Sequence, residues 1–161
     1  MLKFVEGDIL LSKADAIAHG VAPNDDFHSG LALSLHEQWP SLYKDFRHYC
    51  RLSHPQAGNV WSWRGTSGQT IYNLMTQEAA YGQGAKPGKA SLENVRHSLI
   101  ALAEECTRAG HKSLAISRLA TGVGGLDWAA VQPLVEQYLG SLPTNVFVYK
   151  TFKKGVAAEA H

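Results

Sequence analysis

The segment that decides the fold reads Arg118-Leu-Ala-Thr-Gly-Val-Gly-Gly-Leu-Asp-Trp128. It follows a run of β-favouring residues and precedes an apolar pattern with helical spacing, so it predicts a strand, a glycine-rich loop and a helix in succession. Asp127 stands where the N-cap of that helix belongs. In such a loop, backbone N–H groups and the positive end of a helix can face an anion. An ordinary tight turn has the same spacing, so the sequence alone leaves both interpretations open.

The loop glycines favour the anion-binding interpretation. Gly122, Gly124 and Gly125 lack a Cβ atom, which permits positive φ angles and lets a bulky diphosphate approach the backbone. We therefore expect Gly124→Val to block a diphosphate while leaving the fold intact. The spacing is not the GxGxxG of a dinucleotide fold, and no GxxxxGK[ST] occurs, so the Rossmann and P-loop classes are excluded.

The rest of the chain alternates between strand-like and helix-like patterns. Apolar alternation and β-branched runs predict strands, which we place at residues 2–6, 15–21, 59–64, 69–75, 112–118 and 145–152. Helical spacing predicts helices at residues 30–39, about 42–54, 90–109 and 128–139. This order predicts a three-layer α/β/α domain with a central mixed sheet of about six strands. Ligands of such sheets bind where the carboxyl ends of strands meet loops.

Length and composition limit the class of protein. The 161 residues, 45% of them hydrophobic, suffice for one packed domain, which we place at residues 1–152 with a frayed C-terminal tail at 153–161. Fifteen basic against fourteen acidic residues give a net charge of +1, which argues against strong binding to duplex nucleic acid. With two cysteines and no apolar leader or membrane-spanning run, we expect a cytoplasmic monomer that binds no membrane.

Polar side chains gather after the first two predicted strands. Asp8 follows the first strand, where its carboxylate can accept a hydrogen bond from an exocyclic amine such as that of adenine, or can end a turn. His19 ends the second strand, and the polar loop after it carries Asp25, Asp26 and His28. We predict that the last four surround the mouth of a pocket. A satisfied core histidine at His19 and a surface histidine at His28 are the alternative interpretations.

Three pieces of the sequence are most specific in their order and separation. They are Gly7-Asp8-Ile9-Leu10, then Ala18-His19 followed after the loop by Gly30-Leu31-Ala32, and Gly122-Val-Gly-Gly-Leu-Asp-Trp128. Together they resemble the macrodomain family of ADP-ribose-binding α/β/α domains. Within it, the resemblance is to the branch of terminal ADP-ribose protein glycohydrolase and the DarG-like (ALC1-like) proteins, over nearly the whole chain.

The resemblance implies a binding site for each part of ADP-ribose. Asp8 and Ile9 would hold the adenine, the helix start at residues 30–32 and the loop at 121–126 would straddle the diphosphate, and residues 19–29 would line the distal ribose. The ligand-binding residues that we predict are Asp8, Ile9, His19, Gly20, Val21, Gly30, Leu31, Ala32, Thr76, Gln77, Arg118, Thr121, Gly122, Val123, Gly124, Gly125 and Leu126.

This sequence differs from the branch at the positions of its catalytic residues. Its hydrolytic members resemble one another in a lysine just after a strand-ending threonine and, in some, an aspartate in the glycine loop. Here Gln77 follows Thr76 and the loop position is Gly124, so a mechanism through a lysine adduct is not implied. Lys86 and Lys89, in the next loop, are possible substitutes for the amine.

Three functions therefore stay open. The first is hydrolysis, in which a water positioned by His19, Asp25, Asp26 or His28 removes ADP-ribose from a modified protein or nucleic acid. The second is a non-catalytic module that reads ADP-ribose, and the third is a phosphatase acting on ADP-ribose-1''-phosphate, for which the resemblance points to His19. We expect no cofactor and no metal, since the HxCxxxH pattern that starts at His48 lacks a fourth ligand.

Overall fold

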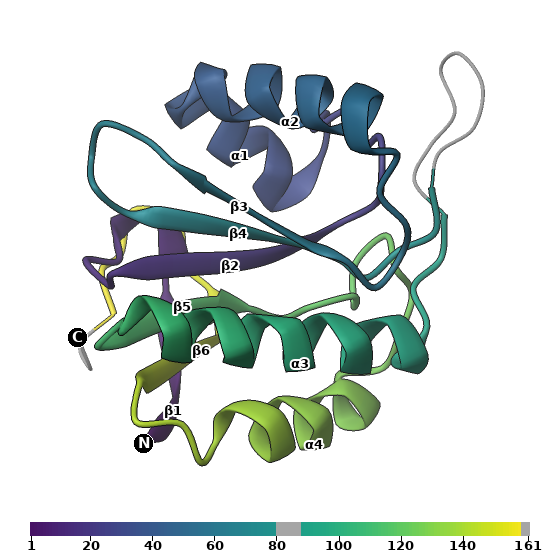
Figure 1. Ribbon diagram of the computed structural model, residues 1–161. Helices are drawn as coiled ribbons and strands as arrows, with labels where there is room; N and C mark the ends of the chain where they lie inside the picture. Colours follow the sequence, from purple (N-terminus) through teal and green to yellow (C-terminus); the bar gives the residue numbers. More distant parts are fainter. Residues whose placement is uncertain (80–87, 159–161) are drawn as a thin grey trace.

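A computed structural model of the protein describes residues 1–79 and 88–158. Its six-stranded sheet lies between two pairs of helices, α1 with α2 on one face and α3 with α4 on the other (Figure 1). The strands are β1 (Leu2–Gly7), β2 (Ala16–Val21), β3 (Val60–Arg64), β4 (Thr70–Met75), β5 (Ser113–Ser117) and β6 (Asn145–Phe152). The helices are α1 (Gly30–Gln38), α2 (Pro40–Ser53), α3 (Leu92–Ala109) and α4 (Trp128–Leu139), and a 3-10 turn, Ile9–Leu11, follows β1. The predicted three-layer α/β/α architecture is confirmed.

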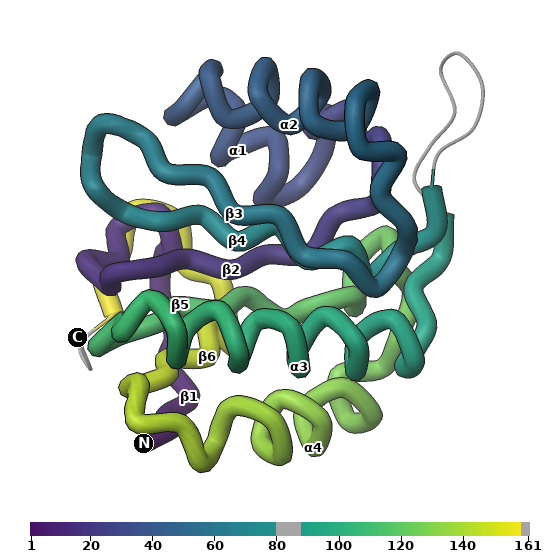
Figure 2. Tube along the Cα trace, in the orientation of Figure 1, coloured from purple at the N-terminus to yellow at the C-terminus, as the bar shows by residue number. Residues whose placement is uncertain are grey.

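The strand order places the functional edge of the sheet. The strands lie in the order β1-β6-β5-β2-β4-β3, with β1, β6, β5, β2 and β4 mutually parallel and β3 antiparallel to β4. In a parallel array the carboxyl ends of the strands reach the same edge. The tube in Figure 2 shows this edge on the right, where the chain leaves both β2 and β5. The loops after these two strands therefore lie close together.

Each face of the sheet carries its own hydrophobic core. Val95 and Leu99 of α3 pack with Val131 of α4 over one face, and all three are fully buried. Leu42 and Phe46 of α2 are fully buried over the other face. Because β2 is covered on both sides, five of its six residues are buried, as expected for a central parallel strand.

Several helix ends follow the residue types found there, whereas the N-cap of α4 does not. Pro40 occupies the first turn of α2, and Gly110 ends α3 with φ 70°, a left-handed conformation that glycine adopts without strain. Asp127 occupies the N-cap position of α4 as predicted, but its side chain makes no capping hydrogen bond. Its backbone carbonyl accepts the N–H of Ala130 at 3.0 Å instead. Within residues 1–79 and 88–158, no helix has the length and apolar character needed to cross a membrane.

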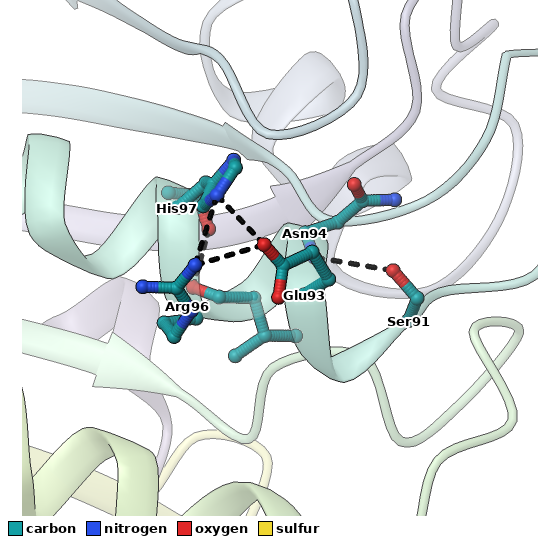
Figure 3. A network of polar contacts seen from close by, with 7 residues as sticks. Ser91, Glu93, Asn94, Arg96 and His97 are labelled. Carbon is teal, nitrogen blue, oxygen red and sulfur yellow. Dashed lines mark hydrogen bonds and ion pairs between the residues drawn. The ribbon is translucent and has the colours of Figure 1, made fainter.

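The start of α3 is tied to the segment that follows β4. Ser91 caps the helix, since its Oγ accepts the N–H of Asn94 at 3.1 Å, and Glu93 pairs with Arg96 at 2.8 Å (Figure 3). The Asn94 side-chain amide donates to Glu78 Oε1 at 3.0 Å. This bond, together with the Glu78 N–H that donates to the carbonyl of residue 89, holds the chain beside the carboxyl end of β4.

The last described residues return to β1. The N–H of Asp8 donates to the carbonyl of Val156 at 2.7 Å, and the N–H of Gly155 donates to Asp8 Oδ2 at 3.0 Å. A Cβ atom on Gly7 would lie 2.8 Å from the Val156 carbonyl, so glycine is what lets the two segments approach. The sequence led us to expect a frayed tail at 153–161. Residues 153, 155 and 156 take part in hydrogen bonds with Gly7, with Asp8 or with one another, and residues 159–161 lie outside the described part.

Candidate functional site

Two cavities adjoin along the carboxyl edge of the sheet. The first, of about 190 Å³, lies among the ends of β2 and β5, the start of α1 and the loop after β5. The second, of about 410 Å³, extends toward the ends of β1 and β6. Both are lined by Gly30, Leu31, Ser117 and Arg118, so the two cavities share these residues as a common wall. The edge predicted from the strand order therefore holds a site.

The start of α1 supplies one wall shared by both cavities. Gly30 adopts φ 59°, and a Cβ atom there would meet no atom within 4 Å. The side chain of Ser29, at the N-cap position, makes no capping hydrogen bond. The first N–H groups of a helix have no intrahelical partner and carry partial positive charge. This wall therefore has the chemistry to bind an anion, and the ligand-binding role of Gly30, Leu31 and Ala32 stays a prediction.

The loop after β5 forms the facing wall, and backbone hydrogen bonds fix its shape. The N–H of Leu126 donates to the carbonyl of Ala120 at 2.9 Å, and that of Gly125 donates to the carbonyl of Gly122 at 3.1 Å. Ala120 has φ 64° and Gly125 has φ 78°. Gly122 and Val123, which the sequence predicted as ligand-binding, are exposed and line the first cavity.

Gly124 corrects one expectation from the sequence. Its φ is not positive, and a Cβ atom there would lie 2.6 Å from the Ala120 carbonyl oxygen and 2.9 Å from Ala90 Cβ. The residue is glycine because the loop packs tightly against its own backbone, and a side chain would distort the loop before it blocked a ligand. Gly122 is the open position, since a Cβ atom there would meet nothing within 4 Å.

His19 is one of the residues that line the first cavity. Its side chain is 1% exposed, and its Nε2 lies 2.6 Å from Asn73 Oδ1. Burial lowers the pKa of His19 to about 4, against a smaller opposing effect of the Asn73 hydrogen bond. The ring meets Phe27 edge to face at 5.9 Å between centroids. His19 is thus a buried, neutral histidine that also lines the cavity, so both sequence interpretations describe part of it.

Asp25 is the carboxylate that the structure places in the first cavity. Its Oδ1 accepts the N–H of Phe27 at 2.9 Å and its Oδ2 accepts the N–H of Ala22 at 3.2 Å. Burial raises the pKa of Asp25, an effect that these two hydrogen bonds oppose. Among the described residues that line the first cavity, Asp25 carries a carboxylate and His19 an imidazole.

Asp26 and His28 lie outside the cavity lining, contrary to the predicted pocket mouth. The side chains of His28 and Asp26 are 72% and 46% exposed and face each other at 3.5 Å. The reason is the left-handed backbone at Phe27, φ 55°, which buries the Phe27 ring while its neighbours stay at the surface. The structure therefore keeps two of the four predicted acid–base residues, His19 and Asp25.

Gln77 lies where the resemblance placed a lysine. Its side chain is 7% exposed, lines the first cavity and donates from Nε2 to the carbonyl of Gly88 at 3.1 Å. Thr76 is fully buried, and its Oγ1 has no hydrogen-bond partner among the described residues. Of the two lysines considered as substitutes, Lys86 lies outside the described residues. Lys89 is exposed, and its Nζ lies 3.2 Å from where a Gly125 Cβ would be.

At the second cavity, Ile9 contributes to the lining as predicted, whereas Asp8 does not. Both carboxylate oxygens of Asp8 already accept backbone N–H groups, from Leu10 at 3.0 Å and from Gly155 at 3.0 Å. The sequence could not reveal the second bond, because Gly155 is 147 residues away. Asp8 thus holds the backbone of neighbouring segments and does not itself line the second cavity.

The remaining predicted residues divide between lining and support. Gly20 and Arg118 line the first cavity, and the Arg118 guanidinium lies 5.4 Å from the centroid of the Trp128 ring. The side chain of Val21 is fully buried, and the Thr121 hydroxyl donates to the Arg118 carbonyl at 3.3 Å. The sequence analysis missed several lining residues at strand ends, in α1 and in the loop after β5, namely Gly7, Ser34, Ser117, Ala120, Tyr149 and Phe152. The parallel strand order was the signal for four of them, at the ends of β1, β5 and β6.

The HxCxxxH pattern does not form a metal site. Cys50 is buried in the core beneath α2, whereas His48 is exposed. Over residues 1–79 and 88–158, no group of three or more His, Cys, Asp or Glu side chains is arranged to hold a metal ion.

Comparisons with known proteins agree with this architecture. No family model matches the sequence. A DNA ADP-ribosyl transferase-DNA ADP-ribosyl glycohydrolase fusion protein of Thermosipho africanus is 26% identical over 167 residues, covering 96% of this chain and 43% of that protein. Human ADP-ribose glycohydrolase OARD1 is 23% identical over 149 residues, covering 92% of this chain and 90% of that protein. This chain spans about two fifths of the length of the bacterial curated relatives that it matches.

Solved structures give the same result. The macrodomain of Thermus aquaticus DarG matches with a TM-score of 0.82 and 25% identity, over 93% of this chain and 98% of that one. The structure of Thermosipho africanus DarTG in complex with ADP-ribose also matches with a TM-score of 0.82, at 23% identity, over 97% of this chain and 42% of that one. The two independent comparisons thus point to one fold.

Proposed function

We propose that this chain, which is a macrodomain, binds ADP-ribose along the carboxyl edge of its sheet and hydrolyses the bond between the distal ribose and an attached protein or nucleic acid group. The family assignment rests on the agreement of fold and sequence comparisons, which confirm the resemblance seen in the sequence. The relatives named as glycohydrolases support the reaction, and the DarTG structure with ADP-ribose supports the ligand.

The observation that carries the proposal is that two unlike cavities lie side by side and share four lining residues. The second is mostly apolar and is lined by Ile9, Tyr149 and Phe152, a surface suited to a nucleobase. The first is more polar and lies between the start of α1 and the loop after β5, two backbone walls suited to a diphosphate. Arg118, which lines both, supplies positive charge at their junction. The apolar second cavity therefore suits a base, and the more polar first cavity suits a diphosphate and a terminal sugar.

We assign the acid–base chemistry in the first cavity to Asp25. Each of its oxygens accepts one backbone N–H group and keeps a lone pair for a water molecule. The raised pKa makes the ionised carboxylate a stronger base than a solvated aspartate. In the proposed reaction a water attacks the anomeric carbon and its proton passes to Asp25. The bond between the anomeric carbon and the attached group breaks, and its electron pair leaves with that group, which takes up a proton from solvent.

A non-catalytic reader of ADP-ribose is the second candidate, and Gln77 favours it. Where the related hydrolases have an amine, this chain has an amide that cannot act as a nucleophile and that is engaged with the Gly88 carbonyl. Both candidates require the same site, so binding alone does not separate them. Turnover does.

The deciding experiment compares two neighbouring carboxylates. We expect calorimetry to show ADP-ribose binding to the wild type, to Asp25→Asn and to Asp26→Asn. Release of ADP-ribose from modified protein and modified DNA should fall by about 10²-fold or more in Asp25→Asn, because the general base is lost, and stay unchanged in Asp26→Asn. Binding without release in the wild type would establish the reader, and absence of binding would refute the site.

A further inference from the structure

The two ring nitrogens of His19 have different surroundings. Nε2 lies 2.6 Å from Asn73 Oδ1, whereas Nδ1 is buried and has no hydrogen-bond partner among the described residues. In the parallel register of β2 and β4, His19 and Asn73 are directly paired. Their contact is therefore set by the sheet itself.

The orientation of the Asn73 amide follows from its other contacts. Its Nδ2 lies 3.1 Å from the carbonyl oxygen of Trp61 and 3.4 Å from that of Ile71. A flipped amide would turn its oxygen toward two carbonyl oxygens and leave both without a donor. Oδ1 therefore faces His19, and an oxygen that only accepts requires a proton on Nε2.

A neutral imidazole carries one proton, so the Nε2–H tautomer leaves a bare lone pair on Nδ1. The burial that lowers the pKa of His19 to about 4 keeps the ring neutral at physiological pH. A buried hydrogen-bond acceptor without a donor costs free energy. The His19 side chain that carries this acceptor is among the residues that line the first cavity. The donor that the described residues do not supply can come from a ligand in that cavity.

We propose that Asn73 is a positioning residue that holds His19 in the Nε2–H tautomer, so that Nδ1 accepts a hydrogen bond from a hydroxyl group of the distal ribose. This inference rests on the proposed function, because it assigns one contact within the ADP-ribose site. It names a residue on β4 that lies outside the cavity lining and acts only through His19.

The arrangement also selects among substrates. A lone pair on Nδ1 attracts a hydroxyl group and repels a phosphate oxygen, and the Asp25 carboxylate in the same cavity adds to that repulsion. The part of the cavity that His19 lines therefore favours a ribose with free hydroxyl groups. ADP-ribose-1''-phosphate, the substrate of the phosphatase alternative, would place a second anion near these two groups.

The first test reads the tautomer in the wild-type protein and needs no variant that must fold. Imidazole ¹⁵N NMR, with the His19 signals assigned by their absence in His19→Gln, should show an unprotonated Nδ1 and a protonated Nε2. Adding ADP-ribose should move the Nδ1 resonance, because that atom gains a hydrogen bond, whereas ADP, which lacks the distal ribose, should not move it. A protonated Nδ1, or an Nδ1 signal unmoved by ADP-ribose, would refute the inference.

Calorimetry in the same samples separates this inference from the proposed function. ADP-ribose that binds without moving the Nδ1 resonance would overturn the inference and leave the site standing. ADP-ribose that does not bind would overturn both.

The second test uses Asn73 itself. Asn73→Leu removes the acceptor, and we expect affinity for ADP-ribose to fall about tenfold relative to affinity for ADP. The ratio of the two affinities cancels any general loss of stability, so a purely structural role for Asn73 would lower both affinities together and contradict the proposal.

Discussion

The two loops that face each other across the first cavity are built in opposite ways. Residues 22–29 connect β2 to α1, and residues 118–127 connect β5 to α4. The first loop is pinned by a side chain, since Phe27 is fully buried and contacts the Phe46 ring at 5.0 Å between centroids. In the second, Leu119 is buried at the start of the loop, the segment beyond it is held by backbone hydrogen bonds and by glycine, and Val123 at its tip is 56% exposed.

The comparison shows which interactions stabilise each loop. Both contain a non-glycine residue in the left-handed region, Phe27 at φ 55° and Ala120 at φ 64°. Such a conformation costs about 1–2 kcal/mol and persists only when the surroundings impose it. Burial of an aromatic ring imposes it in the first loop, and a local pattern of hydrogen bonds imposes it in the second. The first loop should therefore respond to changes in the core and the second to changes in its own backbone.

Truncation of Phe27 should give the largest effect. Phe27→Ala removes the ring that holds the first loop on α2, and we expect the free energy of unfolding to fall by about 3–5 kcal/mol. Binding of ADP-ribose should weaken as well, because Asp25 takes its position from the N–H of Phe27. Denaturant unfolding followed by calorimetry measures both quantities.

Val123→Ala is the matched control in the facing loop. Because Val123 is largely exposed, we expect a change within about 0.5 kcal/mol. Equal losses of stability in the two variants would show that the loops are not built differently.

Acid should destabilise the protein through His19, beneath the first loop. The pKa of His19 is lowered from its ordinary value of 6.5 to about 4 in the folded protein. Between these two values the unfolded chain binds a proton that the folded protein does not, so stability is full above pH 6.5 and falls as pH drops toward 4. The loss amounts to about 3 kcal/mol.

The variant His19→Gln isolates this contribution. Asp25, whose pKa is raised, acts in the opposite sense, because the folded protein gains stability as that carboxylate takes up a proton in acid. We therefore compare the variant with the wild type, in which Asp25 is the same. Superimposable profiles of stability against pH over this range would refute the assignment. Within the second loop, residues 119–126 contain no titratable side chain.

The same difference explains which parts of the site could be predicted from the sequence. Glycines, strand patterns and helix starts are local signals, so the sheet, the second loop and the start of α1 were all foreseen. The orientation of neighbouring side chains in the first loop was not. The left-handed φ of Phe27 depends on contacts with α2, and it separates Asp25 from Asp26. The partner of His19 is 54 residues away on another strand, which no local pattern reveals.

Gly124→Val should destabilise the second loop by about 1–3 kcal/mol. The added Cβ would lie 2.6 Å from the Ala120 carbonyl oxygen, which is the acceptor that fixes the loop. Gly122→Val is the matched control, since a Cβ there meets nothing within 4 Å. We expect Gly122→Val to keep wild-type stability by thermal unfolding and to lose affinity for ADP-ribose through bulk in the cavity. The reverse assignment of the two effects would mean that Gly124, not Gly122, faces the ligand.

Relief of backbone strain in the second loop should give the smallest effect, and one of opposite sign. Ala120→Gly removes the cost of a left-handed alanine, about 1–2 kcal/mol, and adds the entropy cost of glycine, about 0.5–1 kcal/mol, so stability should rise by about 0.5 kcal/mol. Asn24→Gly, at φ 60° in the first loop, should gain less, because asparagine tolerates this region. Both differences are measurable by denaturant unfolding. A loss of stability in Ala120→Gly would mean that the hydrogen bonds of the second loop do not suffice to hold its shape, and that the alanine side chain contributes by limiting the unfolded chain.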